Sequence, residues 1–433
     1  MKSALRYGVA AMTLTASALA FAAEAPRLLS AAQSDPVALK LMEGFPPSPD
    51  RLVTYQNMSQ FPSSRWGFHH MREVVPTKNV WRGPGDNVKR LQTQSLDLGA
   101  LAFDDGSGES TTLEQWLKAT YTDGFLVLHE GRVVYEQYAS GMRPRDQHIL
   151  WSVTKSFTGL LAADLVARGD LDPAALVSRY IPELKDSAWG DATVQQVMDM
   201  TAAVRYREDY KDFNSDVYRY AFAAGIVPAP KNYQGPGSLY EFLPTLTEKD
   251  GKHGDKFTYR TVHSEVLGWI ITRAANQDFN ELLSERVWQK LGAEYDAYAW
   301  VDSHGTAIMG AGMNVTLRDL GRFADMVRQR GRYNGVRIIQ ESAIDELFKG
   351  GDPDKFAGQG MDFRKGYSYH DQWYATHNAN GAIQASGIYG QLIHIDPKAQ
   401  VTVVKLSSHP VASAGYTHTS TTAALNAIVD ALR

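Results

Sequence analysis

The chain lacks cysteine, a prevailing charge sign and, after its first residues, any long apolar run. Its 433 residues include no cysteine, which excludes disulfide bonds, thiolate metal sites and cysteine catalysis. The formal net charge is −4, so the composition favours neither a nucleic-acid partner nor a charged tail. With 44% hydrophobic and 21% charged residues, the composition is that of a soluble globular protein long enough for two or three domains.

The N-terminus has the pattern of a secretory signal peptide. Lys2 and Arg6 precede an apolar run over residues 9–21, and small residues then lead to a cleavage site after Ala22. The run is short and poor in large side chains, so we predict a signal peptide over residues 1–22, with an uncleaved membrane anchor as the alternative. The mature chain is predicted to be exported without a membrane span, and to be periplasmic if the source is a Gram-negative bacterium.

Composition divides the rest of the chain into an extension, a body and an insertion. Residues 23–100 are punctuated by proline and rich in aromatics, which predicts an extension that wraps over the main body. Residues 101–155 and 300–433 carry the strand signals and are predicted to form one α/β body. Residues 156–299 are predicted to form an inserted helical region that contains the substrate loops.

Two hairpins give the clearest strand signals. Residues 125–129 and 132–138 are apolar runs joined by Glu130-Gly131, a two-residue turn, and are predicted to lie centrally in a sheet. Residues 390–395 and 400–406 form a second predicted hairpin around an Asp-Pro turn. Apolar periodicity predicts helices at 112–121, 152–169, 177–181, 193–200, 263–275, 279–290, 316–331 and 419–432.

A serine and a lysine three residues apart stand at the start of the second of these helices. Ser152 lies at or just before the predicted N-terminus, and Lys155 follows one turn later on the same side. A neutral lysine there can take the serine proton, and the helix N-terminus places partial positive charge near developing negative charge. The alternative is that Ser-x-x-Lys occurs by chance and that Ser152 is only an N-cap residue.

The surroundings of this stretch carry a family resemblance. It follows a strong hairpin, precedes a buried-looking helix and lies about a hundred residues before Tyr259. In these features the chain resembles the penicillin-binding-protein and serine β-lactamase superfamily over roughly residues 110–430. The resemblance is to the class C-related branch, which includes family VIII-type carboxylesterases and 6-aminohexanoate-dimer hydrolases. It implies a β-lactamase/transpeptidase-like α/β (α+β) fold, in which helices flank an antiparallel sheet and a helical region is inserted.

The resemblance also implies roles for individual residues. Ser152 would be the nucleophile, Lys155 its base, and Tyr259 the relay that passes a proton to the leaving group. Tyr259-Arg260-Thr261 stands where the superfamily carries Tyr-x-Asn, so the tyrosine matches and the asparagine does not. The alternative for Tyr259 is an ordinary half-buried loop tyrosine.

The third superfamily motif is matched by Ala385-Ser386-Gly387, just before the C-terminal hairpin. By analogy with the dimer-hydrolase branch, the N–H groups of Ile388 and Ser152 would form the oxyanion hole. Ser386 and Gly387 would lie against the substrate, and the glycine would let the substrate approach the backbone closely. Ala385 replaces the basic first residue of the motif, which argues against efficient β-lactam turnover.

The resemblance is weak between residues 205 and 255, which we predict to form the substrate-facing loop. Tyr206, Asp209 and Tyr210 are candidate substrate contacts there, and a solvated loop is the alternative. Neither a metal nor an organic cofactor is predicted. The adjacent histidines His69 and His70 lack the spacing of metal ligands on a regular element.

The sequence therefore predicts an exported serine hydrolase that acts on a small-molecule ester or amide through an acyl-enzyme. The chain contains no Gly-x-Ser-x-Gly, His-Glu-x-x-His or P-loop motif, which argues against other hydrolase classes and nucleotide binding. One alternative is a β-lactamase or D-Ala peptidase-type penicillin-recognising enzyme. Another is a non-catalytic relative that binds peptidoglycan. The acyl group, the leaving group and the oligomeric state stay open.

Overall fold

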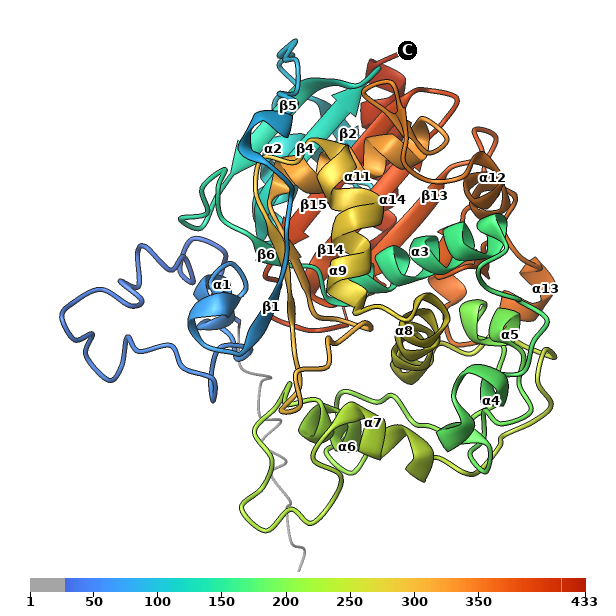
Figure 1. The fold of residues 1–433 in the computed structure, drawn as a ribbon. Helices are drawn as coiled ribbons and strands as arrows, with labels where there is room; N and C mark the ends of the chain where they lie inside the picture. Colours follow the sequence, from blue (N-terminus) through green and yellow to red (C-terminus); the bar gives the residue numbers. More distant parts are fainter. Residues whose placement is uncertain (1–27, 414) are drawn as a thin grey trace, which may run out of the picture.

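The computed structural model describes residues 28–413 and 415–433, so the predicted signal peptide lies outside the described residues. A seven-stranded antiparallel sheet forms the centre of the fold (Figure 1). In spatial order its strands are β11 (Ser368–His370), β12 (Trp373–Ala375), β13 (Ile383–Gly387), β14 (Gln391–Asp396), β15 (Val401–Ser407), β4 (Thr122–His129) and β5 (Arg132–Tyr138). A second, four-stranded sheet has the order β1 (Thr77–Val80), β7 (Ala297–Trp300), β8 (Met313–Val315) and β6 (His148–Ile149). Two small hairpins join β2 (Ala102–Asp104) to β3 (Ser110–Thr112) and β9 (Arg332–Tyr333) to β10 (Val336–Arg337).

The predicted helices are all present, and others accompany them. The helices of the described residues are α1 (Ser64–Gly67), α2 (Leu113–Ala119), α3 (Thr154–Arg168), α4 (Val177–Tyr180), α5 (Val194–Met198), α6 (Asp216–Ala223), α7 (Leu239–Phe242), α8 (Thr261–Ala275), α9 (Phe279–Leu283), α10 (Gln289–Leu291), α11 (Leu317–Arg328), α12 (Glu341–Lys349), α13 (Pro353–Phe356) and α14 (His418–Ala431). The side chains of Thr193 and Thr316 cap α5 and α11 by accepting a backbone N–H, which explains why both helices begin where predicted. None of the helices in the described residues has the length and apolar character that a membrane crossing requires.

The first predicted hairpin is confirmed as β4 and β5, but its predicted central position is wrong. Its turn residues Glu130 and Gly131 both have positive φ (50° and 80°), as a type I′ turn requires. β5 is the last strand in the sheet order, and β4 pairs with β5 on one side and β15 on the other. The unbroken apolar sequence of β4 has another cause, because its alternate side chains, such as Phe125 and Leu126, face two different cores.

These two cores arise because helices cover both faces of the seven-stranded sheet. On one face, α2 and α14 pack Trp116 and Leu425 against the strands. On the other face lies α11, which contacts β4, β14 and β15 (Figure 1). A β-carbon at Gly321 would lie 2.5 Å from the Leu126 side chain, so the glycine lets α11 approach the sheet closely. The predicted antiparallel sheet flanked by helices is therefore the observed architecture.

α3 lies between the sheet and the helical region. It contacts β12 and α12 as well as α8, and its residues from Thr154 to Leu165 are buried on every side. Gly169 ends the helix with a φ of 81°, the left-handed conformation typical of a helix terminus. A short 3₁₀ turn over Trp151–Val153 precedes α3, so Ser152 sits immediately before the helix, as predicted. An enclosed helix of this kind is a rigid support for the groups at its N-terminal end.

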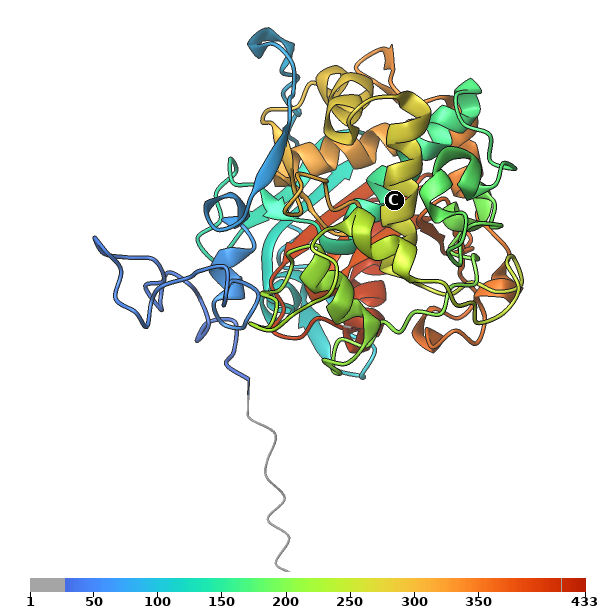
Figure 2. The same ribbon diagram turned by 60° about the horizontal axis from the view of Figure 1, so that its bottom comes forward.

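The segment before the body contains more regular structure than the sequence predicts. β1 pairs with β7, and β7 itself begins at Ala297, inside the range predicted to be helical. Phe68 is fully buried, and its carbonyl oxygen accepts a hydrogen bond from Ile149 N. The loops before α1, blue in Figures 1 and 2, project from one side of the molecule in both views. The segment thus brings Phe68 to the chain that leads to Ser152.

Candidate active site

Ser152 and Lys155 are in direct contact. Lys155 Nζ lies 2.9 Å from Ser152 Oγ and 2.6 Å from the carbonyl oxygen of Gly310. Both side chains are buried, Lys155 almost completely. When the amine is neutral, one N–H donates to Gly310 and the nitrogen lone pair is free to accept the Ser152 proton. The arrangement suits a serine nucleophile paired with an amine base.

Burial tunes Lys155 toward this role. Removal from water lowers the pKa of Lys155 from 10.5 to about 8, although the nearby carboxylates of Glu208 and Glu265 favour the charged ammonium. A pKa near 8 leaves a useful fraction of the amine unprotonated at neutral to mildly alkaline pH. Lys155 can therefore serve as a base without a second cation beside it.

A carboxylate on α8 holds the carbonyl group that orients Lys155. Glu265 accepts hydrogen bonds from Gly310 N (2.8 Å), Met309 N (2.9 Å) and Tyr220 Oη (2.6 Å). Burial raises the pKa of Glu265 to about 7, and these hydrogen bonds oppose the rise. Glu265 thus fixes the loop at residues 309–310, and through it the position of the lysine amine.

Tyr259 lies two residues before the start of α8 and beside Lys155. Lys155 Nζ is 5.2 Å from the centroid of the Tyr259 ring. Burial raises the pKa of Tyr259 well above its usual value, with Tyr374 and Glu208 adding to the rise and a hydrogen bond with Ser152 opposing it. The Tyr259 hydroxyl therefore stays protonated. A proton relay needs this state, because it passes on its own proton while it receives another.

Glu208 is a site residue that the sequence does not predict. Its carboxylate accepts hydrogen bonds from Thr261 N (2.7 Å), Thr261 Oγ1 (2.6 Å) and Tyr210 Oη (2.6 Å). Thr261 stands where the superfamily carries asparagine, so this position is tied to a carboxylate here. The sequence signal for Glu208 was weak, because one acidic residue in a polar, aromatic loop is also what a solvated loop would contain. Its position two residues before Tyr210 is the available hint in the sequence.

Two strained residues flank the predicted oxyanion hole. Trp151, just before Ser152, has a φ of 46°, and Tyr389, just after Ile388, has a φ of 60°. Residues with side chains rarely adopt such values, and the surroundings must hold them there. The Trp151 and Tyr389 ring centroids are 5.5 Å apart, and Phe68 packs against both, at 5.4 Å and 4.9 Å. This aromatic cluster fixes the backbone beside both predicted N–H donors.

Gly387 accommodates the protein's own backbone. A β-carbon at this position would lie 2.7 Å from the Leu150 carbonyl oxygen, closer than real contacts allow. The glycine therefore lets the end of β13 approach the chain that leads into Ser152. This contact with Leu150 requires glycine at residue 387 in addition to the close approach to substrate that the sequence predicts.

Two cavities share Ser152 as a wall residue. The larger has a volume of about 440 Å³ and is also lined by Tyr259, while the smaller has about 150 Å³ and lacks Tyr259. Tyr210 and Ile388 line both cavities. The other predicted substrate contacts that line the larger cavity are Ser386 and Gly387. A scissile bond at Ser152 would have room for one substrate half in each cavity.

Two predicted substrate contacts line neither cavity. Tyr206 is buried, and its hydroxyl has no hydrogen-bond partner among the described residues. Asp209 is exposed, and its carboxylate accepts a hydrogen bond from Lys211 N (2.9 Å). The structure therefore brings Tyr210 to the site and leaves its two predicted companions outside it.

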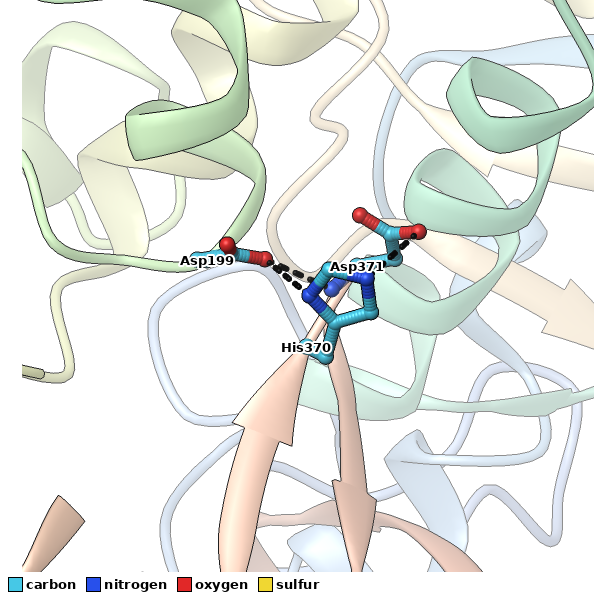
Figure 3. A group of neighbouring side chains, drawn as sticks. All are labelled: Asp199, His370 and Asp371. Carbon is cyan, nitrogen blue, oxygen red and sulfur yellow. Dashed lines mark hydrogen bonds and ion pairs between the residues drawn. The ribbon is translucent and has the colours of Figure 1, made fainter. Parts of the chain in front are cut away.

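A second polar cluster links Asp199, at the end of α5, to His370 and Asp371, at the tip of the β11–β12 hairpin (Figure 3). Each residue offers one possible metal-ligand atom, and these atoms lie within 4.8 Å of one another. However, His370 Nδ1 is 2.8 Å from Asp199 and Nε2 is 3.5 Å from Asp371, so both carboxylates already pair with the imidazole. Burial disfavours the charged imidazole, yet the two carboxylates raise the pKa of His370 to about 9. We interpret the cluster as an ion-pair network that fastens the hairpin to α5.

The sequence and the fold are both similar to those of known hydrolases. The family model described as Beta-lactamase matches residues 113–426. The 6-aminohexanoate-dimer hydrolase of Paenarthrobacter ureafaciens is 35% identical over 363 residues, covering 82% of this chain and 88% of that protein. A solved structure from Bacillus anthracis, described as a candidate 6-aminohexanoate-dimer hydrolase, has a TM-score of 0.82 at 32% identity and covers 89% of this chain and 98% of its own. EstCE1, a hydrolase with promiscuous acyltransferase activity, shares the fold with a TM-score of 0.56 at 16% identity, covering 72% and 98% of the two chains.

Proposed function

The chain belongs to the beta-lactamase family of serine hydrolases, and on that premise we propose that it hydrolyses a small-molecule amide or ester through an acyl-enzyme on Ser152. The observation that carries the proposal is the position of Lys155 Nζ between Ser152 Oγ (2.9 Å) and the Gly310 carbonyl (2.6 Å). With one N–H donated to Gly310, the neutral amine can turn its lone pair to the serine hydroxyl and accept its proton.

In the acylation step, Ser152 Oγ attacks the substrate carbonyl carbon while its proton moves to Lys155. The resulting oxyanion accepts hydrogen bonds from the N–H groups of Ser152 and Ile388. Lys155 then returns the proton through the hydroxyl of Tyr259 to the nitrogen or oxygen of the leaving group. The bond to the leaving group breaks, and the acyl group remains esterified to Ser152.

Deacylation reverses the same proton path. A water molecule attacks the ester carbonyl, and its proton passes to Lys155 either directly or through Tyr259. Ser152 Oγ leaves with a proton returned from Lys155, and the carboxylic acid product is released. Every proton moves between the substrate, the water and these three side chains.

The similarity to a 6-aminohexanoate-dimer hydrolase supports an amide substrate built from a linear amino acid. Esters remain in the proposal because the same steps cleave them with a better leaving group. We further propose that the enzyme is exported, on the strength of the signal-peptide pattern in residues 1–22.

Two alternatives predict different results. A penicillin-recognising enzyme would turn over a cephalosporin, but residue 385 is a buried alanine where such enzymes carry a basic residue. A non-catalytic relative would bind peptidoglycan without acylation, but the contact between Ser152 and Lys155 supports a working nucleophile.

The test is covalent labelling with a serine-reactive fluorophosphonate, together with hydrolysis of a short activated ester. The wild type should be labelled, and Ser152→Ala should lose labelling and about a thousandfold or more of its activity. Ser156→Ala is the matched control, because Ser156 lies one turn farther along α3 and its hydroxyl donates to the Gln372 carbonyl instead. Full activity in Ser152→Ala would refute the mechanism.

A further inference from the structure

The larger cavity at Ser152 contains a buried cation for which the proposed mechanism has no use. Arg364 lies in the short 3₁₀ turn Asp362–Arg364 and lines this cavity together with Ser152 and Tyr259. It is 7% exposed, and its guanidinium lies 3.9 Å from the centroid of the Tyr374 ring. Within residues 28–413 and 415–433, Arg364 makes no ion pair with a carboxylate, and its Nε has no hydrogen-bond partner.

A buried guanidinium without a carboxylate is unfavourable in the free protein. Buried charges are normally paired, because loss of water destabilises an isolated ion strongly. An anion that enters the cavity would supply the missing partner. The planar guanidinium group of arginine can donate two parallel hydrogen bonds to a carboxylate. The contact with the Tyr374 ring holds the guanidinium group in place.

The other titratable groups of the same cavity are either engaged by neighbouring residues or uncharged. Lys405 Nζ donates to Ser407 Oγ and lies 3.4 Å from the Gly390 carbonyl oxygen. Burial and the nearby Arg364 lower the pKa of His418 to about 4, so this imidazole is neutral. The Glu208 carboxylate is bound to Thr261 and Tyr210, as described above. Arg364 is therefore the group best placed to bind an anionic part of a substrate.

The two cavities indicate which half of the substrate carries that anion. Tyr259, the proposed proton donor to the leaving group, lines the larger cavity with Arg364 and is absent from the smaller one. The smaller cavity is lined mainly by apolar and aromatic groups, including Val217, Ala221 and Ile226. Its volume is about 150 Å³, and an apolar cavity of this volume can hold a ring of six carbons.

We propose that Arg364 binds a carboxylate on the leaving group, so that the preferred substrates join an apolar acyl chain of about six carbons to an amine or alcohol that ends in a carboxylate. This inference rests on the proposed function, because it needs Ser152 to be acylated and Tyr259 to face the leaving group. It assigns Arg364 to substrate selection and not to the proton transfers.

Three amides of similar length test the assignment. The first joins hexanoate to 6-aminohexanoate, with the carboxylate on the leaving group. The second joins hexanoate to hexylamine and has no charge. The third joins adipate to hexylamine and carries the carboxylate on the acyl half. The kinetic constants kcat and KM are measured for each in the wild type, Arg364→Gln, Arg364→Lys and the control Arg179→Gln, whose guanidinium pairs with Asp172 at an exposed site.

The wild type should favour the first amide over the other two by about 10- to 100-fold in kcat/KM, the value of a charge-assisted hydrogen-bond pair. Arg364→Gln should abolish this preference, chiefly through a higher KM, and Arg364→Lys should keep part of it. Arg179→Gln should behave as the wild type does. Thermal unfolding and fluorophosphonate labelling of each variant show whether the fold and Ser152 are intact.

Several outcomes would overturn the inference while the proposed function stands. These are equal rates on all three amides, a preference that survives in Arg364→Gln, a preference for the adipate amide, or no hydrolysis of any amide by a protein that the phosphonate still labels at Ser152. Absence of both labelling and hydrolysis in the wild type would instead refute the proposed function itself.

Discussion

The protonation state of Lys155 should control the rate of acylation. Burial lowers the pKa of this amine from 10.5 to about 8. At pH 7 a lysine with a pKa of 10.5 is about 0.03% neutral, whereas one with a pKa of 8 is about 9% neutral. Burial therefore supplies about 300-fold more free base at pH 7. Because Lys155 can act as the base only when its amine is neutral, kcat/KM should rise as the pH rises through 8.

The assay is kcat/KM between pH 6 and pH 10, with an ester whose leaving group does not titrate in this range. The neutral fraction of Lys155 rises about tenfold between pH 7 and pH 9, so kcat/KM should rise by about the same factor and then level off. Activity after return to pH 7 controls for loss of protein at the alkaline end. A flat profile between pH 7 and pH 9, or a rise that continues unchanged to pH 10, would refute the reasoning.

Glu208 provides a second perturbation of the same profile. Its negative charge raises the pKa of Lys155 and so opposes the effect of burial. Glu208→Gln should therefore move the midpoint of the profile to lower pH, whatever it does to the maximal rate. Glu248→Gln is the control, because Glu248 is exposed and pairs with Arg205. A midpoint that stays in place or moves upward in Glu208→Gln would show that this carboxylate does not act on the base.

Three further predictions concern the scaffold of the site. Gly387→Ala should lower kcat by about 10- to 100-fold with little change in KM. The new β-carbon must move away from the Leu150 carbonyl oxygen, and this movement would displace the N–H of Ile388, one of the two predicted oxyanion donors. Steady-state kinetics on a neutral ester would test this prediction. Phe68→Ala should lower the free energy of unfolding by about 3 kcal/mol, measured by urea denaturation, because Phe68 is fully buried. It should also lower kcat. An unchanged kcat would mean that the aromatic cluster does not position the oxyanion donors. In the folded protein the pKa of His370 is raised from 6.5 to about 9. The charged imidazole therefore stabilises the fold fully below pH 6.5, and this stabilisation is lost as the pH rises from 6.5 to beyond 9. The wild type should lose up to about 3 kcal/mol over this range and His370→Gln should lose much less, which urea denaturation at a series of pH values would test.

Local signals in the sequence predicted the elements that depend on neighbouring residues. The turn at Glu130-Gly131 and the helix starts at Thr193 and Thr316 are each decided within a few residues, and all three are observed. The pairing of Ser152 with Lys155 is equally local, since one helical turn separates them. Such features could be predicted because the chain does not need to fold over long distances to form them.

Features that depend on distant parts of the chain were missed or misplaced. The β4–β5 hairpin was expected at the centre of the sheet, but strand order depends on which remote strands pair, and β15 is the neighbour of β4. β1 was not predicted because its partner β7 lies more than two hundred residues away. A short strand in an irregular segment carries no periodicity long enough to recognise.

The same limit explains the errors within the site. Glu208 and Arg364 are ordinary charged residues of loops in the sequence, and only their position in the wall of one cavity with Ser152 sets them apart. Tyr206 and Asp209 carried the same loop signal as Tyr210 but lie outside both cavities. Alternation between inward and outward side chains in a loop has no fixed period, so the sequence could not separate the three.

The most direct test of the account is the intact mass of the protein during turnover of a slowly hydrolysed ester. The account predicts a transient increase by the mass of the acyl group in the wild type, no increase in Ser152→Ala, and a slowly formed, long-lived adduct in Lys155→Met, which keeps the nucleophile without its base. An adduct on Ser152→Ala, or hydrolysis by the wild type with no adduct under single-turnover conditions, would contradict an acyl-enzyme on Ser152.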